Sequence, residues 1–163
     1  EDERFRQQQS VMNLNLRSVL SIPFKIKERV LGAIYLDNRL HRGLFSEKDL
    51  FILAGELATP IDAYDRFAAS YPVITAQKVQ ELEDLIDGFE REVEMPREFV
   101  IPGDSPGSAA IHMARSIVRR AERRVVNLQQ NGQLPNDELL KYLNRFADLL
   151  FTLALYEDQG SQS

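Results

Sequence analysis

The chain contains no cysteine and no tryptophan, and only two of its 163 residues are histidine. The absence of cysteine excludes disulfide frameworks, thiolate-bound zinc and cysteine nucleophiles. With His41 and His112 alone, a multi-histidine metal site is excluded, and a Ser-His-Asp triad would have to use one of the two. No apolar run approaches the roughly 18 residues that a membrane helix needs. No apolar segment follows a basic N-terminus, so we expect no signal peptide. These absences predict a cytoplasmic protein without a membrane partner.

The composition is that of an ordinary globular protein, with 44% hydrophobic and 28% charged residues. Acidic and basic residues balance over the first 70 positions, so the net charge of −5 falls on residues 71–163. A net negative chain is not typical of nucleic-acid binding, and we expect no nucleic-acid partner. Because the hydrophobic pattern changes where the charge balance does, the sequence predicts two domains, 1–70 and 71–163.

The first half has the pattern of two strands followed by a helix. Two short apolar runs, Ser18–Phe24 and Val30–Leu36, flank the polar segment Lys25–Arg29, which predicts an antiparallel hairpin. Ser46 is a good N-cap, and apolar residues then recur at helical spacing at Leu50, Leu53, Ala54 and Leu57. This half is therefore a small β element with one helix.

The second half has the pattern of helices only. Thr75 caps a helix that we expect to run to about Glu94. Ser105-Pro106 opens a second helix, which Asn131-Gly132 ends because this pair accepts left-handed backbone. A third helix is expected from Asp137 to about Tyr156. The predicted fold class is α+β: a short antiparallel β element with a helix, then an all-α part of a helical bundle.

The segment Arg115–Arg124 is unusual because it holds five arginines and one glutamate. At 100° per residue, Arg115, Arg119 and Glu122 share a narrow face beside the apolar stripe of their helix. Arginines beside a core need partners, and two polar residues four apart on the last helix, Asn144 and Asp148, could supply them. A polyphosphate site and a structural ion-pair network explain these residues equally well.

Four motifs, in this order and spacing, resemble the C-terminal part of the PduO-type corrinoid adenosyltransferases over about residues 74–156. They are FVIPG from Phe99, SAAIH ending at His112, RRAER from Arg119, and LNRFADLLF from Leu143. The resemblance implies a trimeric helical-bundle enzyme that transfers the 5′-deoxyadenosyl group of ATP to cob(I)alamin and releases triphosphate. It implies ATP, with Mg2+, bound between subunits, and cobalamin as the second substrate. The family's phosphate-binding loop of the form GDxGxT is not found in residues 1–70, so the implied activity lacks one of its elements.

The resemblance assigns the ATP site to the two C-terminal helices. Arg119 would contact the phosphates and Glu122 would lie close to the nucleotide, and these two are the predicted catalytic residues. Arg123 and Asn144 would help to bind the nucleotide. No protein metal site is predicted.

The resemblance gives the remaining residues supporting roles. Arg115 would form an ion pair between subunits that shapes the ATP site. Asp148 would support this site without touching the ligand. Phe99 would pack near the corrinoid and displace its lower ligand. We expect His112 to be a packed or surface histidine rather than a catalyst.

Residues 12–65 resemble instead the C-terminal part of a GAF domain, through LRSVLSIPF from Leu16, VLGAIYLDN from Val30 and GLFSEKDL from Gly43. Asn38, Phe45 and Asp49 loosely follow a motif of cyclic-nucleotide-binding GAF domains, although a structural role is the better interpretation. The two resemblances meet near residues 68–72. The alternative function is therefore a non-catalytic GAF-type sensory or oligomerisation module, or a fusion fragment.

Overall fold

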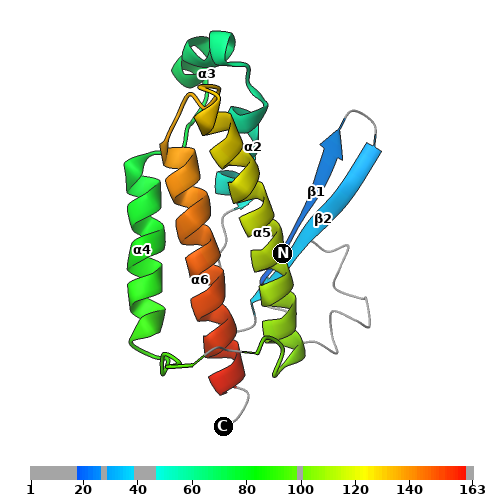
Figure 1. The fold of residues 1–163 in the computed structure, drawn as a ribbon, viewed down its shortest axis with the longest axis vertical. Helices are drawn as coiled ribbons and strands as arrows, with labels where there is room; N and C mark the ends of the chain where they lie inside the picture. The colour runs from blue at the N-terminus through cyan, green and yellow to red at the C-terminus, as the bar shows by residue number, and fades with distance from the viewer. Residues whose placement is uncertain (1–17, 27–28, 39–46, 99–100, 161–163) are drawn as a thin grey trace. The chain divides into compact units, whose positions relative to one another are not determined.

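The computed structural model describes residues 18–26, 29–38, 47–98 and 101–160, with side chains from Lys48 onward (Figure 1). The chain divides into two compact units, 1–47 and 48–163, which are described separately. The division falls after Glu47, whereas the sequence pattern placed the domain boundary between residues 70 and 71.

The N-terminal unit contains a two-stranded antiparallel sheet. Strand β1 (Ser18–Ile26) pairs with β2 (Arg29–Asn38) in a register that sets Ser18 opposite Asn38. Pro23 lies within β1 opposite Ala33, and the register shifts after Phe24. A proline is tolerated there because each strand of a two-stranded sheet has one free edge. The hairpin lies where the sequence pattern predicted one, but this geometry alone does not identify a GAF domain.

Helix α2 (Glu47–Ala58), the short helix η2 (Ile61–Ala63) and α3 (Tyr64–Ser70) lead into the helical unit. Helix α2 is tied to this unit by Glu56, whose side chain has no exposed surface. Its carboxylate accepts hydrogen bonds from Tyr64 Oη at 2.6 Å, from Asn136 Nδ2 at 2.8 Å and from the backbone N–H of Ile74. Asp49, at the start of α2, lies 3.3 Å from Lys78 Nζ. These contacts place α2 with the helices rather than with the strands.

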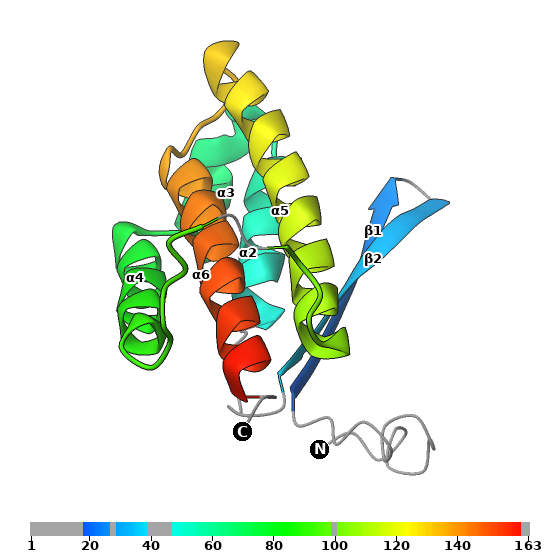
Figure 2. The ribbon, with the colours of Figure 1, turned by 60° about the horizontal axis from the view of Figure 1, so that its bottom comes forward.

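Three long helices make the core: α4 (Ala76–Glu90), α5 (Pro106–Gln130) and α6 (Glu138–Gly160). Helix α6 lies between α4 and α5 and packs against both (Figures 1 and 2). Most of its apolar side chains are buried, namely Leu139, Leu143, Phe146, Leu149, Leu150, Leu153 and Leu155. Burying each such side chain stabilises the fold by roughly 1.5–3 kcal/mol. Helix α6 is thus the centre of the unit.

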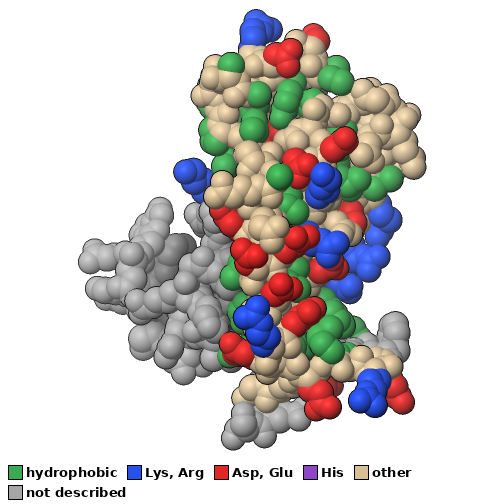
Figure 3. Space-filling model, turned by 90° about the vertical axis from the view of Figure 1, so that its left-hand side faces the viewer, with side chains coloured by type: hydrophobic (Ala, Val, Ile, Leu, Met, Phe, Trp, Pro, Cys, Tyr) green, Lys and Arg blue, Asp and Glu red, His purple; other side chains and the backbone are tan. Residues whose placement is uncertain are grey.

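Helix α4 is amphipathic. Its buried side is apolar, formed by Val79, Leu82, Ile86 and Phe89. Its outer side carries exposed acidic residues, and red and blue side chains are interspersed on this face of the molecule (Figure 3). The spacing of 3.6 residues per turn explains both sides. None of the described helices is long and apolar enough to cross a membrane.

The helix boundaries follow local capping chemistry. Thr75 accepts a hydrogen bond from the N–H of Lys78, and Ser105 forms a reciprocal capping box with Ser108. At the end of α5, Gly132 adopts φ +65° after the C-cap Asn131. These three ends confirm the sequence prediction.

Two helix ends differ from their predicted positions. Helix α4 stops at Glu90, four residues before the predicted Glu94, and α6 extends to Gly160 rather than Tyr156. The Gln159 side chain makes two hydrogen bonds of 2.9 Å to the backbone of Glu94. We attribute both differences to this long-range clamp, which holds the chain out of the helix after α4 and anchors the last turn of α6.

Candidate functional site between helices 5 and 6

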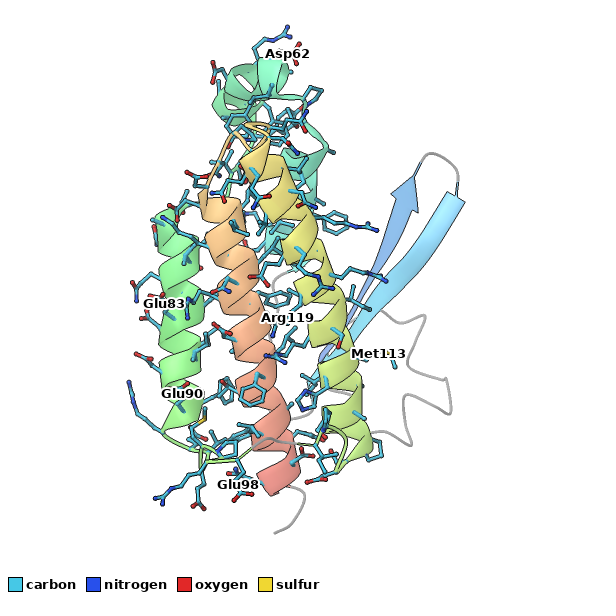
Figure 4. All side chains as sticks on the ribbon, viewed as in Figure 1. Asp62, Glu83, Glu90, Glu98, Met113 and Arg119 are labelled. Carbon is cyan, nitrogen blue, oxygen red and sulfur yellow. The ribbon has the colours of Figure 1, made fainter. Side chains whose placement is uncertain are left out.

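The predicted site residues lie on two helices that pack along one another, α5 and α6. Helix α5 supplies Arg115, Arg119, Glu122 and Arg123, and Arg119 lies about midway along it (Figure 4). Helix α6 supplies Asn144 and Asp148. The structure therefore brings six of the seven predicted residues to one interhelical seam and its exposed edge. The seventh, Phe99, lies outside the described residues.

Glu122 and Asn144 join the two helices directly. Asn144 Nδ2 donates a hydrogen bond of 2.9 Å to Glu122 Oε1, and both residues are half-buried. Because the amide nitrogen is bonded to the carboxylate, the orientation of the Asn144 carbonyl oxygen is fixed. The pair therefore holds the Asn144 carbonyl oxygen and the Glu122 carboxylate at fixed positions beside the arginines, where both can accept hydrogen bonds.

Arg115 is held between the helices without an acidic partner. Its Nε donates to the backbone carbonyl of Ala147 at 3.2 Å, and its guanidinium lies 5.1 Å from the centroid of the Phe151 ring. It makes no ion pair with any residue that the structure describes from position 48 onward. Burial lowers its pKa, and the positive charge of Arg119 lowers it further. Arg115 is thus a half-buried cation whose charge the carboxylates of Asp148 and Glu122 offset only in part.

Arg119 and Arg123 extend this positive charge along the exposed edge of α5. Both are exposed, and within the described part of the helical unit neither forms an ion pair. These three neighbouring guanidinium groups repel one another, and the carboxylates of Glu122 and Asp148 offset only part of their charge. Planar, permanently charged guanidinium groups suit the oxygens of a phosphate chain.

Asp148 has a different partner from the one that the sequence suggested. The sequence suggested that Asp148 could partner an arginine of the opposite helix, but Asp148 Oδ2 accepts a bond of 3.0 Å from Arg145 Nη1 on its own helix. Arg145 Nε also lies 3.4 Å from Glu83 Oε1 of α4. The side chains of all three are more than 40% exposed, so these ion pairs add little stability. Asp148 still acts on Arg115 through its charge, which raises the pKa of that arginine.

The sequence analysis missed Phe151, whose ring lies under Arg115 and beside the buried His112. Its position carried a usable signal, because Phe151 follows Asn144 by seven residues and Asp148 by three. These spacings place all three on one face of α6. His112 is 9% exposed, in agreement with the predicted packing role.

No group of three or more metal-ligating side chains occurs among the described residues. Magnesium prefers near-octahedral oxygen ligation and is commonly bound largely through substrate phosphates and water. The seam fits such an ion only as part of a bound nucleotide, with Glu122 on the same helix as the arginine row.

Comparison with known proteins gives one consistent family. A family model described as cobalamin adenosyltransferase matches residues 36–157. The chain is 36% identical over 132 residues to a corrinoid adenosyltransferase of Citrobacter freundii, covering 78% of this chain and 73% of that protein. It is 39% identical over 100 residues to corrinoid adenosyltransferase MMAB of Bos taurus, but spans only 41% of that protein's length.

The solved structures agree. A variant of the PduO-type ATP:corrinoid adenosyltransferase from Lactobacillus reuteri, complexed with cobalamin and ATP, superposes with a TM-score of 0.63 at 33% identity. The match covers 71% of this chain and 60% of that one. A second variant from the same organism, complexed with ATP, gives a TM-score of 0.61.

Proposed function

Because the chain belongs to the cobalamin adenosyltransferase family, we propose that it transfers the 5′-deoxyadenosyl group of ATP to cob(I)alamin. Relatives named corrinoid adenosyltransferases and a structural neighbour complexed with both substrates support this proposal. The observation that carries it is the row of arginines on α5, which have no acidic partner among the described side chains. A row of guanidinium groups that no described carboxylate engages in an ion pair fits a leaving triphosphate better than it fits a structural ion-pair network.

The reaction replaces a carbon–oxygen bond by a carbon–cobalt bond. The cobalt(I) centre supplies both electrons of the new bond to the 5′ carbon of ATP, and triphosphate leaves with the electron pair of the broken bond. Negative charge therefore grows on the phosphate oxygen as the bond breaks. In this proposal Arg119 and Arg123 lie along the triphosphate and stabilise that charge.

Glu122 and Asn144 would then orient the nucleotide. Their mutual hydrogen bond fixes the acceptor oxygens relative to the arginines, which favours one pose of the bound ATP. Arg115, held by Ala147 and Phe151, would keep its charge directed at the same site from within the seam. An ion pair from Arg115 to a second subunit, and support of the site by Asp148, belong to the same proposal.

Further parts of the proposal follow from the family. Phe99 would pack near the corrinoid and displace its lower ligand, and Mg2+ would enter with ATP. We propose a homotrimer in the cytoplasm, with ATP between subunits.

For the N-terminal unit we propose a segment derived from a GAF domain. The match to the cobalamin adenosyltransferase family model begins at residue 36. Only the residues before position 36 therefore belong to the GAF resemblance alone.

The test is adenosylation by the purified chain, given ATP and chemically reduced cobalamin without oxygen and followed by the visible spectrum. We expect adenosylcobalamin to form, and Arg119→Ala to abolish both product and ATP binding. The matched control is Arg124→Ala, an exposed arginine of the same helix lying about 140° around from Arg119. The control should retain both properties.

Two results would contradict the proposal. Unchanged ATP affinity in Arg119→Ala would remove the arginine row from the nucleotide site. A folded chain that binds ATP and cobalamin without making product would leave the non-catalytic module as the function. Binding and turnover must therefore be measured on the same preparations.

A further inference from the structure

A buried pair of titratable side chains lies behind the arginine row and has no part in the proposed reaction. His112 of α5 is 9% exposed and Asp158 of α6 is 7% exposed. His112 Nε2 and Asp158 Oδ1 are both fully buried, and neither has a hydrogen-bond partner among the residues whose side chains the structure describes. Buried polar atoms are nearly always paired, because an unpaired one destabilises the fold. Purely structural packing here would be better served by apolar side chains.

His112 is connected to the site through one aromatic ring. The His112 ring meets Phe151 edge-on, with centroids 6.2 Å apart and planes inclined at 63°. The guanidinium of Arg115 lies over the same Phe151 ring at 5.1 Å. His112 and Arg115 are also neighbours on α5, three residues apart. A change in the charge of His112 therefore changes the electrostatic potential at the Arg115 guanidinium.

We propose that His112 is a proton-linked positioning residue, coupled to Arg115 through the Phe151 ring and to Asp158 across the α5–α6 seam, and that its protonation strengthens the binding of an anionic ligand at the arginine row to whose charge Arg115 contributes. The ligand class is a polyphosphate such as the triphosphate of ATP, so this inference rests on the proposed function. It adds a control of that site by pH.

The charges around His112 set the direction of the coupling. Two charged groups act on it: Arg115 from its own helix, which lowers its pKa, and Asp158 from α6, which raises it. Burial lowers the pKa of His112 more than either. An anion bound at Arg115 offsets the charge of that arginine, so it favours the protonated imidazole. By reciprocity, protonated His112 must favour the bound anion by the same factor.

The sequence makes a direct test possible, because His41 is the only other histidine. In a His41→Gln background, the single remaining imidazole can be titrated by NMR in the full chain. We expect Arg115→Gln to raise the pKa of His112, and Asp158→Asn to lower it. Arg124→Gln, which removes an exposed arginine three turns along α5, is the matched control and should leave the titration unchanged.

The link to the ligand is tested with Mg·ATP, or with inorganic triphosphate if ATP does not bind. Saturating ligand should raise the pKa of His112 in the parent chain and have no such effect in Arg115→Gln. Ligand affinity should increase by roughly threefold between about pH 7.5 and pH 5.5, relative to His112→Gln. Taking the ratio to His112→Gln removes the titration of the phosphates themselves.

The outcomes separate this inference from the proposed function. If ATP fails to bind while triphosphate raises the pKa of His112, the proposed activity fails and the proton link stands. If ATP binds and turns over but the pKa of His112 does not respond to ligand, the activity stands and the link is overturned. A His112 titration that is the same in Arg115→Gln, in Asp158→Asn and in the parent also overturns it.

Discussion

The fully buried Glu56 should be the most sensitive single side chain for the stability of the helical unit. Its carboxylate accepts from Tyr64 Oη at 2.6 Å, from Asn136 Nδ2 at 2.8 Å and from the Ile74 backbone. Asn136 in turn bonds the Ile74 carbonyl at 2.9 Å and caps α6 by accepting from the N–H of Glu138 at 3.1 Å. One carboxylate therefore joins α2, the segment before α4 and the first turn of α6.

The expected loss of stability follows from the three hydrogen-bond donors that the Glu56 carboxylate accepts from. A hydrogen bond to a charged group contributes about 1.5–3 kcal/mol, and a buried donor left without an acceptor costs about 1–3 kcal/mol. These terms overlap, so we expect Glu56→Leu to reduce the free energy of unfolding by about 3–5 kcal/mol. Glu56→Gln keeps the shape and one acceptor oxygen, and should cost about 1–2 kcal/mol. Removal of the Tyr64 hydroxyl alone should cost about 1 kcal/mol.

The assay is urea denaturation of the full chain, followed by far-UV circular dichroism with linear extrapolation to water. The control is Glu81→Gln, an exposed carboxylate of α4 that should stay within about 0.5 kcal/mol of the parent. The reasoning is refuted if Glu56→Leu costs no more than this control. It is also refuted if Glu56→Leu and Glu56→Gln are equal, because the cost then would not come from the lost acceptors.

Three further predictions concern local features of the same unit. Ser105→Ala removes the capping box of α5 and should cost about 1 kcal/mol, read from the urea midpoint. Gly132→Ala, at φ +65°, should cost about 1 kcal/mol, whereas Gly88→Ala within α4, where an added Cβ meets nothing within 4 Å, should stabilise by about 0.5–1 kcal/mol. The pKa of Tyr64 is raised from 10.0 to about 12, chiefly by burial and then by Glu56. Its neutral form thus adds stability below pH 10 that is lost as pH rises through about 12, and a melting-temperature series should show a shallower alkaline loss in Tyr64→Phe.

Helix ends and helix faces could be predicted from the sequence because both depend on local rules. Thr75 and Ser105 mark helix starts, since a hydroxyl at the N-cap satisfies a free backbone N–H wherever it occurs. The facing of Glu122 and Asn144 followed from the turn angle of each helix and from the apolar stripe beside it. Such features need no knowledge of the rest of the fold.

The features that could not be predicted depend on distant parts of the chain. Asp148 is the exception, because its partner Arg145 lies three residues away on the same helix, a spacing that the sequence alone could have indicated. The pattern of α2 shows that it is amphipathic, yet only the contacts of Glu56 show which unit it joins. The role of Phe151 needed the position of Arg115 above it.

The central place of α6 has a consequence for local opening of the fold. Helices α4 and α5 make their main packing contacts with α6, which is buried on nearly all sides. Either outer helix can therefore detach while the other stays packed, whereas α6 becomes accessible only when both are lost. Amide protons of α6 should accordingly exchange with solvent only through global unfolding, and those of α4 through a smaller and more frequent opening. The half of the proposed site to which Asn144 belongs is thus the last part of the helical unit to open.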